Sequence, residues 1–151
     1  MITLIGDGGH AAVIRDLIRA RERCDRSGII AQEEGTILAF PDNRERKREA
    51  DKRPGEHYAY LIHPSATVAS SALIGLGTVI MAGAVVQPRA SIGEHCIVGT
   101  CATVDHDCAV GDFVHLAPGA HLRSGVRVRE GAFVGCAVPA GETIFAWVTF
   151  A

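Results

Sequence analysis

The sequence predicts a mainly β protein in which short strands stack into a parallel β-helix of six-residue repeats. Two observations predict this fold. From Ile62 to Val134 an aliphatic residue returns at every sixth position, thirteen times without a miss, and from Val68 on the residue two positions before each one is small or β-branched. A period of six fits neither an amphipathic helix nor a simple alternating strand. It fits a strand and a corner, repeated, with each unit stacking on its neighbours.

The aliphatic anchors of the repeat are expected to point inward. They are Ile62, Val68, Ile74, Ile80, Val86, Ile92, Val98, Val104, Val110, Leu116, Leu122, Val128 and Val134. Three units make one triangular coil, so residues eighteen apart should lie above one another. After Val134 the register fails, and it resumes at Val138 and Ile144. The apolar end of the chain is expected to fold over the last coil or to be buried between subunits.

Residues 61–151 are therefore predicted to form a β-helix domain, and residues 1–60 a small α/β domain that precedes it. In this first domain we expect strands at 1–5, 28–31 and 36–40, helices at 10–23 and 42–52, and a segment at 57–62 that leads into the repeat. The charge run within 42–52 predicts a solvated helix face, with Asp42 or Asn43 as its cap.

A glycine-rich turn follows the first predicted strand. Gly6, Gly8 and Ala11 match the G-x-G-x-x-G/A pattern that lets a phosphate approach a helix N-terminus. The domain is too short for a complete dinucleotide fold, which predicts a shortened, Rossmann-like unit. A nucleotide or sugar recognition module and a purely structural cap on the β-helix both remain open.

Composition narrows the class of protein. Hydrophobic residues make up 48% of the chain, aromatic residues only 5%, and there are 17 glycines, as a small aliphatic core with many corners requires. The net charge of −2 does not indicate a nucleic acid or an anionic membrane as partner. The sequence shows no apolar run of membrane-spanning length and no signal peptide. Five cysteines without a CxxC pair favour reduced thiols and a cytoplasmic location; Cys96 and Cys108 fall on the small inward place.

The first place of each repeat should point outward, and on one face these residues form an apolar stripe. The stripe is Leu61, Val79, Ile97, His115 and Phe133. An exposed stripe of this kind needs a cover, and a symmetric assembly is the economical one. We therefore expect a homo-oligomer.

His106 is the leading candidate for acid–base chemistry. It stands between Asp105 and Asp107 at a predicted corner, and no histidine of the repeat occupies an inward place. An imidazole can take a proton near neutral pH, and an adjacent carboxylate can hold its tautomer. Because Cys96 and Cys108 are expected to point inward while the histidines point outward, a shared tetrahedral zinc site is not expected.

The stretch VDHDCAVGDFVHLAPGAHL, with GDGGHA and IHPSA before it, resembles the bacterial sugar acyltransferases of the NeuD/PglD type. The resemblance implies a left-handed β-helix, a homotrimer, acetyl-CoA as cosubstrate, and a nucleotide-linked 4-amino sugar as acceptor in surface-glycan biosynthesis. It implies that His106 is the general base with Asp107 beside it, and that His115 helps to position the thioester at a subunit interface. It also implies that His10, with Gly8 and Gly9, meets the nucleotide of the acceptor.

Further site residues follow from this expected mechanism. Backbone amides near Ser124 and Gly125, eighteen residues beyond His106, are expected to stabilise the oxyanion. Where the family has a basic tail and an acidic pair, this chain offers Arg127, flanked by Arg123 and Arg129, for CoA, and Glu33 and Glu34 for the acceptor. Two other readings remain open: a sugar O-acetyltransferase of the sialic acid branch, and a catalytically silent β-helix scaffold.

Overall fold

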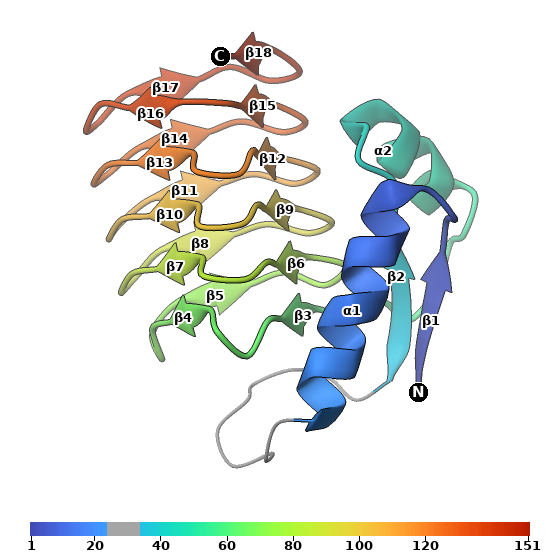
Figure 1. Ribbon diagram of the computed structural model, residues 1–151. Helices are drawn as coiled ribbons and strands as arrows, with labels where there is room; N and C mark the ends of the chain where they lie inside the picture. Colours follow the sequence, from blue (N-terminus) through green and yellow to red (C-terminus); the bar gives the residue numbers. More distant parts are fainter. Residues whose placement is uncertain (24–33) are drawn as a thin grey trace.

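The computed structural model describes residues 1–23 and 34–151. Most of these residues form a prism of stacked coils whose sides are three sheets of short parallel strands, of six, five and five strands (Figure 1). A strand joins its sheet through the strand one full coil later, as Val79↔Ile97 and Ile97↔His115 show. The predicted stacking of residues eighteen apart is therefore confirmed.

The three faces of the prism are made of two-residue strands in the predicted order. The first face contains β3 Leu61–Ile62, β6 Val79–Ile80, β9 Ile97–Val98, β12 His115–Leu116, β15 Phe133–Val134 and β18 Thr149–Phe150. The second contains β4 Thr67–Val68, β7 Val85–Val86, β10 Thr103–Val104, β13 His121–Leu122 and β16 Ala137–Val138. The third contains β5 Leu73–Ile74, β8 Ser91–Ile92, β11 Ala109–Val110, β14 Arg127–Val128 and β17 Thr143–Ile144.

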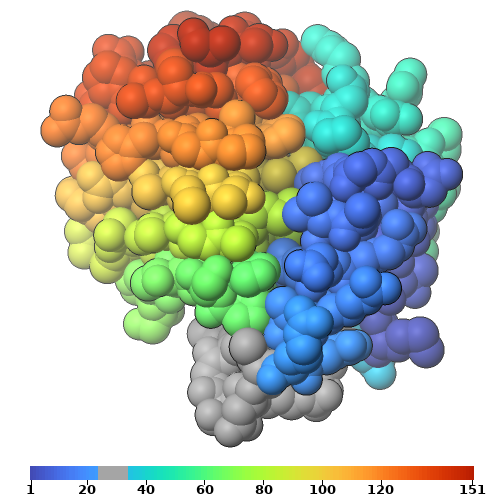
Figure 2. Space-filling view, viewed as in Figure 1, coloured from blue at the N-terminus to red at the C-terminus, as the bar shows by residue number. Residues whose placement is uncertain are grey.

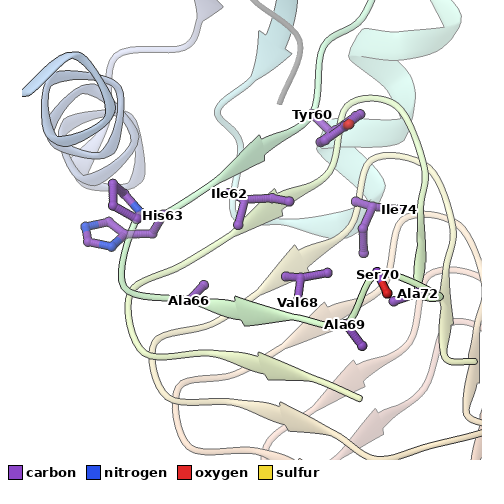
Figure 3. A pocket seen from close by; sticks show the side chains of 10 residues that line it. Tyr60, Ile62, His63, Ala66, Val68, Ala69, Ser70, Ala72 and Ile74 are labelled. Carbon is purple, nitrogen blue, oxygen red and sulfur yellow. The ribbon is translucent and has the colours of Figure 1, made fainter. Parts of the chain in front are cut away.

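The anchors form the core of the prism. All of them are buried except Val68 and Ile74, which are partly exposed in the first coil because that coil is the end of the stack. Figure 3 shows these two side chains and Ile62 around a hollow of about 190 Å³ at this end. The thiols of Cys96 and Cys108 are each 1% exposed, which confirms their predicted inward direction.

The change of register after Val134 is also confirmed. Strand β16 begins three residues after β15 ends, and it pairs with β13 through His121↔Ala137, sixteen positions apart instead of eighteen. The chain then resumes its six-residue rhythm, and β18 extends the first face. Phe150 remains 37% exposed, because the end of the chain adds to the coil and does not fold over it.

The N-terminal segment contains β1 Ile2–Ile5, α1 Gly9–Arg23, β2 Gly35–Leu38 and α2 Asn43–Asp51. Strands β1 and β2 are parallel neighbours, so β1, α1 and β2 form a β-α-β unit. The described residues contain this unit but no larger doubly wound sheet; the strand expected at 28–31 lies outside them. Both expected helices are present, and the Asp42 carboxylate caps α2 by accepting from the Glu45 N–H at 2.7 Å. Within the described ranges, neither helix is long and apolar enough to cross a membrane.

The apolar stripe on the first face is covered by the chain's own N-terminal segment, which corrects our expectation. Leu61, Val79 and Ile97 are at most 3% exposed, and they share an apolar cluster with Ile14 and Leu17 of α1 and with Ile37 of β2. Figure 2 shows this segment packed closely against the coils. The prediction that a second subunit covers the stripe left the N-terminal segment out of the packing. The burial of these three residues therefore gives no argument for an oligomer, and the homo-oligomer itself stays a prediction.

The charged helix α2 is not simply solvated either. Arg46 is 1% and Asn43 9% exposed, and both bind backbone carbonyls of the coils. The predicted solvated face was wrong for these two residues, because a pattern of charge alone cannot distinguish a solvated arginine from one that binds carbonyl groups at a buried surface.

Candidate functional site

His106 lies at the exposed corner between β10 on the second face and β11 on the third. This corner is opposite the first face, which the N-terminal segment covers (Figure 1). The His106 N–H donates to Asp105 Oδ1 at 2.8 Å, and its ring Nδ1 lies 2.7 Å from Asp107 Oδ2. An ionised carboxylate can only accept, so Nδ1 carries a proton, and the lone pair of the neutral imidazole is then on Nε2. The pair expected from the sequence is formed.

Asp107 also accepts from an arginine that the sequence analysis did not single out. Arg89 Nε lies 2.7 Å from Asp107 Oδ1, and Arg89 Nη2 lies 2.9 Å from Oδ2. The hydrogen bonds from Arg89, and then that from His106, hold the pKa of the Asp107 carboxyl well below its usual range. This pair could have been found from the sequence, because Arg89 is eighteen positions before Asp107 and residues eighteen apart stack one coil apart.

One coil beyond His106, the amide of Gly125 is already engaged. It donates to the His106 carbonyl at 3.2 Å as part of the coil-to-coil ladder. Of the two amides expected to stabilise the oxyanion, those of Ser124 and Gly125, this leaves the Ser124 N–H as the candidate donor.

His10, on α1 of the N-terminal segment, and His115, on β12 of the first face, meet at a second place, where the segment packs on the coils. The ring Nδ1–H of His115 donates to the Pro41 carbonyl at 3.2 Å, while His10 Nε2 is buried without a hydrogen-bond partner among the described residues. Burial, with smaller contributions from His115 and then Arg46, lowers the pKa of His10 to about 4. Burial, with a smaller contribution from Arg46, lowers the pKa of His115 to about 4. Both rings are therefore neutral at pH 7.

The glycine-rich turn brings His10 to this place. Gly6 has a φ of +121°, and a Cβ there would lie 2.9 Å from the Ala39 carbonyl oxygen. Only glycine therefore lets the loop pass close to the end of β2. Gly8 has open space where a side chain would be, and so has Gly9, at which α1 begins. Beside His115, a groove of about 410 Å³ runs between Asn43 of α2 and Trp147 of the last coil.

The remaining predicted residues are dispersed. Glu34 precedes β2, so it lies at the opposite end of the parallel β1–β2 pair from the turn that follows Ile5; it faces the N-terminal amine at 4.0 Å. Because the two strands run parallel, Glu34 lies away from His10 within one chain, and its expected role toward the acceptor stays a prediction. Glu33 lies outside the described residues. Arg127 is exposed on β14 of the third face. Within the described ranges, no group of three or more His, Cys, Asp or Glu side chains could hold a metal ion.

The fold of stacked hexapeptide coils defines a class of protein, the hexapeptide-repeat transferases. Residues 71–106 match the family model described as bacterial transferase hexapeptide (six repeats). The acetyltransferase domain of PglB from Neisseria gonorrhoeae is 32% identical, with 97% of this chain and 92% of that chain covered and a TM-score of 0.71. Another solved structure of that domain contains acetyl coenzyme A.

Two further relatives are named for the same kind of reaction. UDP-N-acetylbacillosamine N-acetyltransferase of Bacillus subtilis is 38% identical, covering 54% of this chain and 51% of that protein. A mutant of perosamine N-acetyltransferase from Caulobacter crescentus, solved with CoA and GDP-perosamine, is 29% identical over 99% of this chain and 90% of that one, with a TM-score of 0.66. The chain spans about half the length of the curated relatives it matches. It belongs to the NeuD/PglD-like family of sugar acyltransferases.

Proposed function

We propose that the protein transfers an acetyl group from acetyl-CoA to the amino group of a nucleotide-linked sugar. The observation that carries the proposal is the corner site: a solvent-facing imidazole whose Nδ1 is bound to a carboxylate, with a backbone amide one coil further on. This arrangement supplies a general base and a candidate oxyanion donor. The relatives named above support the identities of donor and acceptor.

In the proposed reaction, Nε2 of His106 accepts a proton from the acceptor amine as its nitrogen attacks the thioester carbonyl. The new C–N bond forms, and the Ser124 N–H stabilises the oxyanion. The C–S bond then breaks, and the imidazolium returns the proton to the departing thiolate. Asp107, kept ionised by Arg89, stabilises the imidazolium while it exists.

The proposal includes a homotrimer, in which the site is completed by a neighbouring subunit. Within one chain the His106 corner lies opposite the first face, and His10 and His115 lie under the segment that covers that face. One chain therefore presents the two halves in different directions. If both halves serve one site, the corner of one subunit must meet the His10–His115 side of another.

The test is a thiol-release assay with acetyl-CoA and a panel of 4-amino nucleotide sugars, with matched hydroxyl sugars alongside. We expect release with an amino sugar, and a loss of about 100-fold or more in kcat for His106→Ala. His63→Ala, which removes a histidine from the first coil, is the matched control. Release with hydroxyl sugars only would identify an O-acetyltransferase, and undiminished turnover by His106→Ala would overturn the assignment of the base.

A further inference from the structure

Arg89 and Asp107 occupy equivalent positions on one edge of the prism, one coil apart. Both have a left-handed backbone, with φ of 60° in each. This shared conformation directs both side chains away from the same corner. The fixed stacking distance then brings the guanidinium to the carboxylate at 2.7 and 2.9 Å, with two parallel N–H···O bonds.

The bidentate contact determines how the carboxylate faces His106. A carboxylate held by one donor can rotate, whereas one held by the planar fork of an arginine is fixed in plane and direction. Asp107 Oδ2, which receives Arg89 Nη2, is also the oxygen that lies 2.7 Å from His106 Nδ1. The orientation of the imidazole therefore depends on Arg89 through Asp107.

The backbone at Arg89 and Asp107 is also held in place by hydrogen bonds. The Arg89 N–H donates to Ser71 Oγ, another coil earlier, at 3.2 Å, and the Asp107 N–H donates to the Pro88 carbonyl at 3.3 Å. The three side chains remain open to solvent, with exposed fractions of 65% for Arg89, 46% for Asp107 and 51% for His106. An exposed ion pair contributes little to stability. The main effect of the Arg89–Asp107 pair is therefore on the orientation of the His106 imidazole.

We propose that Arg89 is a positioning residue for His106: by fixing Asp107 it keeps the proton on Nδ1 and directs Nε2 outward as the base. This inference rests on the proposed acetyl transfer. It assigns to Arg89 no contact with either substrate, and it distinguishes this arginine from the other exposed arginines of the chain.

The first readout is structural and needs no substrate. In protein labelled with ¹⁵N-histidine, the ring ¹⁵N shifts of His106, assigned by the loss of its signals in His106→Gln, report which nitrogen is protonated. We expect wild type to show the Nδ1–H form and Arg89→Gln to show a mixture with the Nε2–H form. Arg48→Gln, at an exposed position on α2, is the matched control and should resemble wild type. An unchanged Nδ1–H form in Arg89→Gln would overturn the proposal.

The second readout is kinetic. Arg89→Gln should lower kcat by about 10- to 100-fold with little change in the KM for acetyl-CoA, and Arg89→Lys should recover part of the loss because it keeps the charge without the fork. The acid limb of the kcat/KM profile should move to higher pH in Arg89→Gln, since Asp107 then faces His106 uncompensated. Asp105, the other carboxylate at this corner, is present in wild type and in Arg89→Gln, so its effect on His106 is the same in both proteins.

The two readouts separate two failures. If wild type transfers acetyl to no acceptor, the proposed function fails while the ¹⁵N comparison still tests the role of Arg89. If wild type is active but Arg89→Gln has the same kcat and pH profile, the positioning role is refuted and the proposed function remains.

Discussion

At the residue scale, most corners of the prism contain one position with a left-handed backbone. Glycine occupies about half of these positions in the coils, and non-glycine residues the others, with φ between 53° and 60°. The non-glycine residues are Arg89, His95, Cys101, Asp107, Phe113 and Trp147. Left-handed backbone costs a residue with a Cβ about 1–2 kcal/mol, so each of these positions is strained.

In five of the six, the side chain makes a contact that a glycine could not make. Arg89 binds Asp107, His95 stacks on Phe113 with ring centroids 5.0 Å apart, and Trp147 lies under the Arg44 guanidinium at 4.9 Å. Cys101 is the exception, since its free thiol is exposed.

Cys101 therefore permits a test of the corner strain. We expect Cys101→Gly to be more stable than Cys101→Ala by about 0.5–1 kcal/mol, because glycine removes the left-handed strain and only part of that gain is lost to its greater freedom in the unfolded chain. Alanine is the matched control, since it removes the thiol but keeps the Cβ. Urea midpoints of the two variants measure the difference, and equal midpoints would show that this corner is unstrained.

At the element scale, α2 is attached to the coils through two polar side chains. Arg46 donates to the carbonyls of His95 at 2.7 Å and Phe113 at 3.2 Å, and to that of Phe40 at 2.7 Å. Asn43 Nδ2 donates to the carbonyls of Gly131 and Ala132 at 3.0 and 3.1 Å. The carbonyls of His95, Phe113 and Gly131 belong to successive coils, so α2 contacts three stacked corners and ties three coils to the N-terminal segment.

Arg46→Ala should lower the free energy of unfolding by about 3 kcal/mol or more, because it leaves several buried carbonyls without donors and opens a void. The matched control is Arg48→Ala on the same helix, whose side chain is exposed and whose loss should change stability by less than about 0.5 kcal/mol. Urea unfolding at one fixed protein concentration gives both values. Equal effects of the two substitutions would contradict the role given to Arg46.

At the scale of the whole molecule, the contact between the N-terminal segment and the coils contains three partly or fully buried imidazoles. His95, 4% exposed, packs between Tyr58 and Phe113, and burial lowers its pKa to about 4, assisted by the charge of Arg46. His10 and His115 have pKa values lowered to about 4 for the same first reason. These rings lie where the N-terminal segment packs on the coils. Protonation of the rings therefore destabilises the contact between the two parts of the chain.

Acidification should therefore destabilise the protein. Between pH 6.5 and pH 4 the unfolded chain binds protons that the folded chain does not, so the free energy of unfolding decreases as the pH falls through this window. His95 alone contributes on the order of 2 kcal/mol between pH 7 and pH 4.5. We expect a lower urea midpoint at pH 4.5 than at pH 7, and a smaller pH effect in His95→Gln once its stability at pH 7 is subtracted. An equal pH effect in the two proteins would contradict this account.

The coils could be predicted from the sequence almost completely, whereas the contacts between the two parts of the chain could not. The six-residue period determines which anchors point inward and which residues stack, so the faces, the shortened coil after Val134 and the His106–Asp107 corner all followed. The period carries no information about what packs on an outward face. The cover over Leu61 and Val79 and the burial of Arg46 were therefore missed.

The partner of Asp107 was missed for a different reason. The eighteen-residue repeat places Arg89 one coil from Asp107. The left-handed backbone that directs the Arg89 side chain toward the carboxylate is visible only in the structure. The position of Glu34 also required the structure: the parallel pairing of β1 and β2 places it at the end of the pair that lies away from the glycine-rich turn.

The coil length has a consequence for how this gene can change. Arg89 meets Asp107 only while the chain between them makes one full circuit, so inserting or deleting a single codon there would carry the arginine out of reach of its carboxylate. Beyond Val134, where one coil is already two residues shorter than the others, an insertion or deletion of one codon leaves the Arg89–Asp107 contact unchanged. The tolerance of the chain to insertions and deletions should therefore change sharply from one side of that point to the other.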